Sequence, residues 1–303
     1  MNSCPNCYNV TRAREDAGHE CASCGWGSGR VGGVVEMLSQ SDRESRAFKE
    51  YLTNYDEIAE DDLSESILDR TYIGHQANNM LKYIGNVTGS RVCELGVGQG
   101  VLAKALVSAG AESVVAVDIS LPYLKRMENK RSIQPVLANA ENLPYLNEFD
   151  IVTSTDVMEH VLNVGSYLIS VNRSLKVRGR AYIRVPYRES LLKYSPKMGC
   201  KYEYVHLRNF NKKLLRDMFV DAGFSIRKYH IDGYSIFTPR DIYMDNKSFK
   251  RIYELIQKKV LEKIGNPSDV NKWNSLLCRV FMRPHEIVVE AVKEKHIELK
   301  SGY

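Results

Sequence analysis

A strand, a glycine-rich turn, a helix and a second strand follow one another before residue 119, and this order constrains the fold more than any other feature. Residues 91–95 are a short β-prone run, and Gly96-Val97-Gly98-Gln99-Gly100 is the turn. Residues 101–109 have helical character, and the apolar run 114–117 ends at Asp118. Glycines let the backbone turn sharply and approach a ligand, and a helix start presents free N–H groups. The order therefore predicts an α/β domain that binds a nucleoside, because an acid ending the second strand can accept hydrogen bonds from ribose hydroxyls.

Two details separate this loop from a dinucleotide site. Its spacing is G-x-G-x-G, whereas dinucleotide sites carry G-x-G-x-x-G. An acid, Glu94, also stands two residues before the first glycine. A carboxylate would repel a phosphate at this loop but would stabilise a cationic amino-acid group. We therefore expect a cationic ligand that contains a nucleoside, and not NAD.

The loop and four later segments resemble the motifs of class I S-adenosylmethionine-dependent methyltransferases. These five segments are Glu94 to Gly100, Val117 to Ser120, Leu137 to Tyr145, Phe149 to Val161, and Gly179 to Pro186. The resemblance runs from about residue 90 to residue 230 and resumes near residue 286. The chain departs from it at Asn139, where the family usually has Asp, so the expected contact with adenine is altered.

The resemblance implies an α/β fold with a Rossmann-like, seven-stranded and mostly parallel sheet, whose last two strands form an antiparallel pair. Residues 225–231 and 286–292 have the alternation expected of that pair. The methyltransferase domain would then comprise residues 86–234 and 284–298, with a helical insertion over residues 235–283. The insertion has three interpretations: a lid over the substrate, a contact between the subunits of a homodimer, and an extension of the core.

The family also implies S-adenosyl-L-methionine as the cofactor and assigns its binding to residues within the matching motifs. The cofactor-binding residues expected from the resemblance are Glu94, Gly96, Gly98, Gly100, Asp118, Ile119, Asn139, Ala140, Glu141, Thr155, Asp156, Tyr72 and His75. The last two precede the domain, in a helical linker and cofactor cover predicted over residues 31–85. They would cover the methionine part of the cofactor, and packing in the core is the rival interpretation.

Asp156, His160 and His206 are the expected catalytic residues. If a helix starts near Asp156, then Asp156, Glu159 and His160 share one face and can hold Mg²⁺ or Mn²⁺ that polarises a hydroxyl group. The ubiquinone-biosynthesis O-methyltransferases are similar at this place. The rival interpretation is that these side chains cap the helix and line the cofactor pocket. His206 is expected to be a general base or a fourth metal ligand, and a loop histidine that holds its own backbone is the alternative.

Two Cys-x-x-Cys pairs predict a zinc ribbon over residues 1–30. The pairs are Cys4 with Cys7 and Cys21 with Cys24. Each pair aims two thiolates at one ion, and four thiolates complete the closed tetrahedral site of structural zinc. Such a short segment has no core of its own, so zinc would supply most of its folding free energy. Reduced thiols and a redox pair are the alternatives.

Charge is distributed unevenly along the chain, although the net charge is only +5. Residues 36–69 hold 11 acidic and 3 basic side chains, whereas residues 173–228 hold 15 basic and 4 acidic ones. Tyrosines accompany the basic side chains between residues 187 and 204. Such a mixture suits an anionic or sugar-like ligand, and it also suits single-stranded RNA.

These features together predict an enzyme that O-methylates a small or medium-sized metabolite, with anionic and sugar-containing molecules among the candidates. The first alternative is an RNA methyltransferase that uses the ribbon and the basic span, so nucleic acid is the less favoured partner. The second is a non-catalytic protein that keeps the cofactor fold. No apolar run approaches the roughly 20 residues of a membrane helix. The first residues lack the pattern of a secretory signal. We therefore expect a cytoplasmic protein without a membrane partner.

Overall fold

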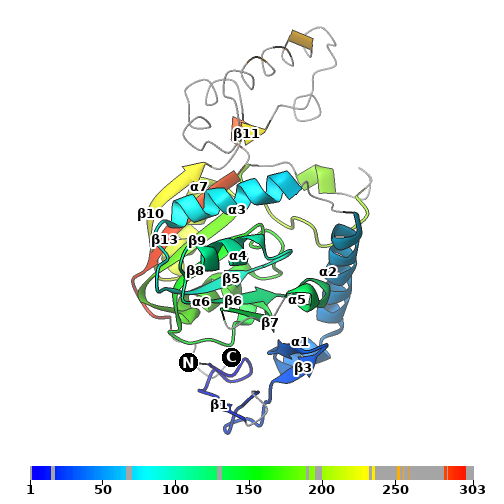
Figure 1. Ribbon diagram of the computed structural model, residues 1–303, viewed down its shortest axis with the longest axis vertical. Coiled ribbons are helices and arrows are strands. Elements are labelled where there is room, and N and C mark those ends of the chain that lie inside the picture. The colour runs from blue at the N-terminus through cyan, green and yellow to red at the C-terminus, as the bar shows by residue number, and fades with distance from the viewer. Residues whose placement is uncertain are drawn as a thin grey trace.

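A mostly parallel sheet forms the centre of the computed structural model, with the strand order β10-β13-β9-β8-β5-β6-β7-β4-β3 (Figure 1). The described residues run from 2 to 297, with gaps at 15–17, 66–69, 128–131, 189–190, 195–199, 232–233 and 285, and with only four residues described between 236 and 282. The sheet and its covering helices confirm the predicted α/β, Rossmann-like fold.

Five parallel strands form the middle of the sheet. They are β5 (Arg91–Leu95), β6 (Ser113–Asp118), β7 (Ile133–Leu137), β8 (Phe149–Thr155) and β9 (Leu175–Pro186). Their apolar runs are almost continuous because both faces of a parallel sheet are buried by helices. The helices associated with them are α4 (Val101–Ser108), α5 (Leu121–Arg126), α6 (Val164–Ser174) and α7 (Lys212–Asp221).

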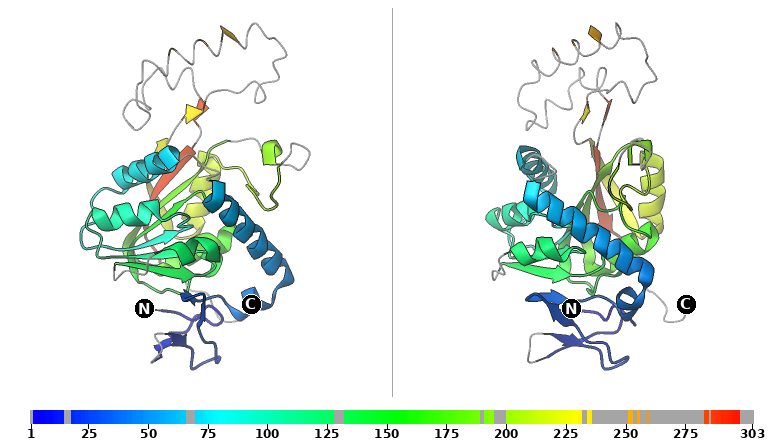
Figure 2. Two further views of the ribbon diagram at one scale, coloured as in Figure 1. Left: turned by 45° about the vertical axis from the view of Figure 1, so that its right-hand side comes forward. Right: turned by 90° about the vertical axis from the view of Figure 1, so that its right-hand side faces the viewer.

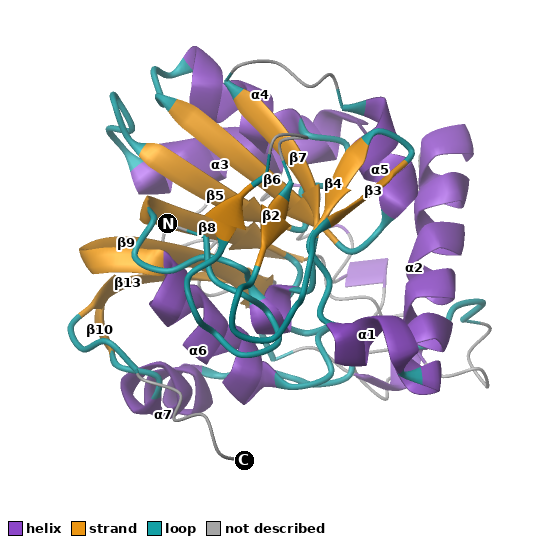
Figure 3. Cartoon of the chain, turned by 90° about the horizontal axis from the view of Figure 1, so that it is seen from below, coloured by secondary structure: helices purple, strands orange, loops and turns teal. Residues whose placement is uncertain are grey.

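Helices lie on both faces of the sheet (Figure 3), and the hydrophobic core has one layer under the helices of each face. The layer under α6 and α7 includes Tyr167, Leu215 and Phe219, which are fully buried. The layer under α3 (Arg70–Ile84) and α4 includes Met80 and Leu106, which are also fully buried. Burial of each such side chain contributes about 1.5–3 kcal/mol to folding, so the two layers hold the strand ends in fixed positions.

The antiparallel end of the sheet has the predicted topology. β13 (Glu286–Lys293) lies antiparallel between β9 and β10 (Phe224–Ile231). Two short strands, β11 (Tyr234–Ser235) and β12 (Arg283–Pro284), pair with each other beyond this edge. The helical insertion predicted over residues 235–283 lies almost wholly outside the described residues, and so do the lid and the dimer contact proposed for it.

Two short strands extend the sheet beyond the seven that were expected. β4 (Val34–Glu36) pairs parallel with β7, and β3 (Gly29–Val31) pairs antiparallel with β4. The strands cover the edge of β7, whose backbone groups would otherwise be exposed for pairing with other chains. Sequence reasoning placed these residues in the ribbon and the helical linker because a three-residue strand carries no recognisable period.

The N-terminal module, here residues 2–36, packs against the loop that follows β7. It contains the hairpin of β1 (Arg12–Ala13) and β2 (His19–Glu20). Asn2 forms an isolated antiparallel bridge with Tyr145, and the Nδ2 atom of Asn142 donates to the Pro5 carbonyl at 2.7 Å. The module is therefore attached to the same loop that was expected to contact adenine.

Helices α1 (Gln40–Glu44), α2 (Arg46–Glu65) and α3 follow the module, in agreement with the helical pattern of the linker. The capping box of Ser39 and Asp42 begins α1, because each side chain bonds to the backbone N–H of the other. The long helix α2 runs across one flank of the domain (Figure 2). Within the described residues, none of the helices combines the length and the apolar character that crossing a bilayer requires.

Candidate active site

A cavity of about 560 Å³ lies at the carboxyl ends of the parallel strands. This is the edge where open α/β sheets bind ligands. Its described lining comes from the ends of β5, β6, β7, β8 and β9, from α2 and α3, and from the loop before α7. The predicted cofactor-binding residues in this lining are Glu94, Gly96, Gly98, Asp118, Ile119, Asn139, Ala140, Thr155 and Asp156.

The glycine turn forms one wall of the cavity. Gly96 has φ +68°, and a Cβ atom there would collide with the side chain of Val157. Gly98 has φ +49°, and a Cβ atom there would meet open space. The backbone N–H of Gly98 donates to the Asp118 carboxylate at 2.9 Å. The turn therefore needs glycine for its conformation at both positions, and it leaves room for a ligand beside Gly98.

Two buried carboxylates lie next to this turn. Asp118 accepts hydrogen bonds from the N–H groups of Gly98 and Ser120, each at 2.9 Å, and burial raises its pKa to about 6. Glu94 is 4% exposed, and burial, followed by the charge of Asp118, raises its pKa well above its ordinary value. Among the described residues, the Oε2 atom of Glu94 has no hydrogen-bond partner. A ligand with a cationic group near Glu94 and hydroxyl groups near Asp118 would stabilise the ionised form of both carboxylates. These residues therefore fit S-adenosyl-L-methionine.

The segment after β7 forms the next wall. The Oδ1 atom of Asn139 accepts a hydrogen bond from the N–H of Glu141 at 2.9 Å, and its Nδ2 atom donates to Asp42 at 3.1 Å. The carboxylate of Glu141 accepts from the N–H groups of Leu162 and Asn163. Glu141 is therefore occupied with the backbone and is not part of the described lining, and neither is Gly100, which caps the start of α4.

Helix α2, part of the helical linker and cofactor cover expected over residues 31–85, lines the cavity through residues that were not named from the sequence. Tyr51, Tyr55 and Asp62 of α2 belong to the lining. The Oδ2 atom of Asp62 accepts from Gln99 of the glycine turn and from the Tyr123 hydroxyl, each at 2.9 Å. The acidic residues of this helix are visible in the sequence, but which of their side chains face the cavity depends on how the helix packs.

Helix α3 contributes three described residues to the lining that were not named from the sequence. Its described residues in the lining are Ile73, Gln76 and Ala77, and His75 is half-buried outside the lining. The side chain of Tyr72 lies outside the description. The expected helix therefore reaches the cofactor cavity through Ile73, Gln76 and Ala77.

Asp156, another residue of the lining, is engaged by Arg184. The Nη1 atom of Arg184 lies 2.7 and 2.6 Å from the two carboxylate oxygens of Asp156, and Gln76 donates to the same carboxylate at 3.1 Å. Arg184 is 2% exposed, and it also lies 3.7 Å from Glu286. Asp156 therefore has its own cation, and the structure does not place it in the metal-ligand set that the sequence suggested.

The remaining members of that set are close together. The ligand atoms of Glu159, His160 and His206 lie within 4.8 Å of one another. Glu159 is fully buried, and the His160 and His206 rings are 4.8 Å apart and perpendicular. The ring of Tyr194 stacks on His206 with a centroid separation of 4.0 Å. His160, His206 and Tyr194 belong to the lining of the cavity, and Glu159 lies buried beside them.

Two tyrosine hydroxyls border the imidazoles. The hydroxyl of Tyr55 donates to the Tyr204 carbonyl at 2.9 Å, and that of Tyr51 donates to the His160 carbonyl at 3.5 Å. Burial raises the pKa of both hydroxyls, so both stay protonated near neutral pH. The imidazoles are therefore better suited than the tyrosines to accept a proton.

The four N-terminal cysteines form a second cluster. The sulfur atoms of Cys4, Cys7, Cys21 and Cys24 lie within 4.8 Å of one another. Four thiolates bound tetrahedrally to zinc at about 2.3 Å would have comparable separations. The cluster is therefore compatible with the predicted zinc ribbon.

Several cations of the basic span are engaged within the domain. Lys176 pairs with Asp150 at 2.7 Å, and Arg178 and Arg227 both pair with Glu294 at 3.3 Å. Arg184 pairs with Asp156, as described above. Part of the excess positive charge in this span is therefore neutralised by contacts within the chain.

Comparison with known proteins agrees with this geometry. A family model described as a methyltransferase domain matches residues 93–183. The uncharacterized protein MJ0638 of Methanocaldococcus jannaschii is 29% identical over 60% of this chain and 70% of its own length. The mitochondrial ubiquinone biosynthesis O-methyltransferase of Schizosaccharomyces pombe is 31% identical over 31% of this chain, and the alignment spans 36% of that protein.

Two solved structures share the fold. One is a chain from the Haloferax volcanii complex of the Trm112 methyltransferase activator with a methyltransferase, with a TM-score of 0.55, 17% identity, and coverage of 80% of this chain and 98% of that one. The other is a methyltransferase from Bacillus halodurans, with a TM-score of 0.50, 20% identity, and coverage of 72% and 99%. The fold, the site and these matches define a class I methyltransferase. The chain belongs to the S-adenosylmethionine-dependent methyltransferases.

Proposed function

We propose that the protein methylates a hydroxyl group of a small or medium-sized metabolite. The observation that carries the proposal is the pair of imidazoles, His160 and His206, in the lining of the cavity beside the buried Glu159. A hydroxyl acceptor must lose a proton during methyl transfer, so a base beside the acceptor is required. An amine acceptor in its neutral form would not need one.

S-Adenosyl-L-methionine, when bound, supplies an activated methyl group on a sulfonium centre. The chain's own residues bind and orient the two reactants. The ends of β5 and β6 hold the cofactor through Glu94, the glycine turn and Asp118, while His160 and His206 accept the proton of the acceptor. Helix α2 covers the cavity and limits the access of water. Alignment and shielding are the main contributions that a protein makes to such a displacement.

Aromatic side chains favour an acceptor with a flat or sugar-like surface. The tyrosines in the lining are Tyr51, Tyr55, Tyr123, Tyr194 and Tyr202. Among the described residues of the lining, none is a lysine or an arginine. We therefore propose that the methylated portion of the metabolite is uncharged, and that any anionic group it carries lies outside this cavity.

Glu159, His160 and His206 would be the ligands if the reaction used Mg²⁺ or Mn²⁺. Their close grouping supports this role, and Asp156 would not take part because it is paired with Arg184. The N-terminal cysteines would hold Zn²⁺ in a structural site, separate from the reaction.

Substitution of His160 by alanine tests the proposal most directly. With S-adenosyl-L-methionine and a panel of hydroxylated metabolites, we expect kcat to fall by about 10²–10⁴-fold. His75→Ala is the matched control, because that histidine lies on α3 outside the described lining. An unchanged kcat in the His160 variant would contradict the proposed role of His160. Loss of wild-type activity after chelation would show that a metal ion also takes part.

An RNA acceptor is the second candidate, supported by the excess of basic side chains between residues 173 and 228. Its weakness is that several of these cations are paired with acids of the same domain. The two candidates differ in salt dependence. RNA binding releases counterions and would weaken steeply between low and moderate salt, whereas turnover of an uncharged metabolite would change little.

A further inference from the structure

The carboxyl ends of three adjacent strands would each lie beside a different part of the bound cofactor. β5 ends beside Glu94, β6 ends at Asp118, and β7 ends two residues before Asn139. If a cationic amino-acid group lies at Glu94 and the ribose at Asp118, the base must lie at the end of β7, because the three strands are neighbours in that order. Ile119, Ala138 and Ala140 give this end an apolar lining, and Asn139 adds one polar group. A flat base with an exocyclic amine suits such a pocket.

An asparagine at this position has two possible orientations with opposite consequences. Its carbonyl oxygen can accept a hydrogen bond from an exocyclic amine, whereas its amide nitrogen would oppose that amine. Asp42 and the N–H of Glu141 select the orientation together. An ionised carboxylate only accepts hydrogen bonds, so the Nδ2 atom of Asn139 must face it, as it does at 3.1 Å. The Oδ1 atom then faces the N–H of Glu141 and the end of β7.

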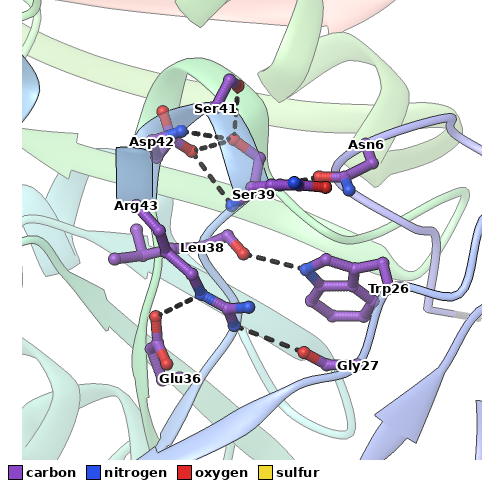
Figure 4. A network of polar contacts seen from close by, with 10 residues as sticks. Asn6, Trp26, Gly27, Glu36, Leu38, Ser39, Ser41, Asp42 and Arg43 are labelled. Atoms are coloured by element: carbon purple, nitrogen blue, oxygen red, sulfur yellow. Dashed lines mark hydrogen bonds and ion pairs between the residues drawn. The ribbon is translucent and has the colours of Figure 1, made fainter. Parts of the chain in front are cut away.

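Asp42 is itself held by the segment before it. Its Oδ2 atom accepts from the N–H and the hydroxyl of Ser39, at 3.1 and 2.7 Å, so Oδ1 is directed to Asn139. The neighbours of Ser39 are bound to the N-terminal module (Figure 4). The indole of Trp26 donates to the Leu38 carbonyl at 2.9 Å, and the N–H of Gln40 donates to the side chain of Asn6 at 2.8 Å. Through these contacts the N-terminal module fixes the segment around Ser39, and Ser39 in turn positions Asp42.

We propose that Asp42 is a positioning residue for cofactor recognition, which turns the carbonyl of Asn139 toward the exocyclic amine of the cofactor's base. This inference rests on the proposed function, because it assumes that the cavity binds S-adenosyl-L-methionine. It also explains why asparagine stands at residue 139. An aspartate there would place two carboxylates within hydrogen-bond distance of each other, and their repulsion would drive one away or protonate it.

Three variants and two ligands test the proposed pair of Asp42 and Asn139. S-Adenosylhomocysteine carries the amine, and S-inosylhomocysteine carries a carbonyl oxygen in its place. We expect the wild-type protein to bind the adenosyl compound about tenfold or more tightly than the inosyl compound. Asp42→Asn should reduce this preference, because the new amide no longer requires the Asn139 nitrogen to face it, and only the N–H of Glu141 still holds the Asn139 carbonyl in place. The capping oxygen for Ser39 is retained in this variant, so the fold should persist.

The reciprocal variants give the decisive comparison. Asn139→Asp should weaken S-adenosylhomocysteine binding through repulsion by Asp42. The double variant Asp42→Asn with Asn139→Asp should restore both affinity and preference, since the amide and the carboxylate have only exchanged places. Glu44→Gln, on the exposed side of α1, is the control and should behave as wild type. Absence of rescue, or an unchanged preference in Asp42→Asn, overturns the inference. A wild-type protein that binds neither ligand would instead overturn the proposed function.

Discussion

Arg184 holds both carboxylate oxygens of Asp156 and lies 3.7 Å from Glu286, so one buried guanidinium serves two acids. Its position near the end of β9 places this cation beside two residues of the cavity lining, Asp156 and Glu286. The arrangement keeps Asp156 in place without a metal ion. The pair with Arg184 distinguishes Asp156 from the neighbouring Glu159 and His160, whose ligand atoms group with that of His206.

Replacement of Arg184 by methionine should therefore destabilise the fold strongly. Both acids would lose their cation in a poorly solvated place, and we expect a loss of about 3 kcal/mol in the free energy of unfolding. Urea denaturation measures this change. Arg178→Met is the control, because its pair with Glu294 is exposed to solvent and should contribute little to stability. Equal effects of the two substitutions would show that the buried pair has no special role.

The raised pKa of Asp118 predicts how cofactor affinity depends on pH. Burial raises this pKa to about 6 in the cofactor-free protein, so the carboxylate that accepts ribose hydroxyls is present above that value and is protonated below it. Affinity for S-adenosylhomocysteine should be highest above the pKa and should fall by up to about tenfold per pH unit below it. Calorimetric titrations between about pH 5 and pH 8 measure the profile.

Asp118→Asn separates this effect from that of Glu94. The variant should bind more weakly at about pH 8 and should have a flatter profile, and any remaining slope belongs to Glu94, whose pKa is also raised. An identical slope in the variant and the wild type would mean that Asp118 does not govern the dependence.

The cysteine cluster predicts one bound zinc ion per chain. Cys24→Ser should lose the metal and loosen the N-terminal module, whereas Cys93→Ser should keep it, because Cys93 is buried in β5 away from the cluster. Metal analysis and the absorbance of a cobalt-substituted protein report on the thiolate site. Stoichiometric zinc in the Cys24 variant would argue against four-cysteine coordination.

Much of the domain could be predicted because its signals are local. The glycine turn and Asp118 are separated by one helix, and their positions follow from the order of strand, turn, helix and strand. The antiparallel pair at the end of the sheet was recognisable from the alternation of two eight-residue strands. Glu94 could be assigned a ligand role because its distance from the first glycine is fixed by the strand.

The contributions that escaped prediction depend on packing between distant segments. The Asp62 contacts with Gln99 and Tyr123 require α2 to lie across the strand ends, and no short pattern specifies that direction. Asp156 was assigned to a metal because its spacing to Glu159 suits a shared face, but Arg184, which lies in β9, is its partner. A contact between residues so far apart in the sequence cannot be read from their spacing.

The central claim is that the cavity beside the glycine turn binds S-adenosyl-L-methionine, and Gly98→Arg tests it most directly. Gly98 has a positive φ and borders open space, so an arginine side chain would strain the turn and occupy the place of the ligand. Calorimetry with S-adenosylhomocysteine should give binding to one site in the wild type and none in the variant. Equal affinity in the two proteins, or no binding to a folded wild type, would contradict the account.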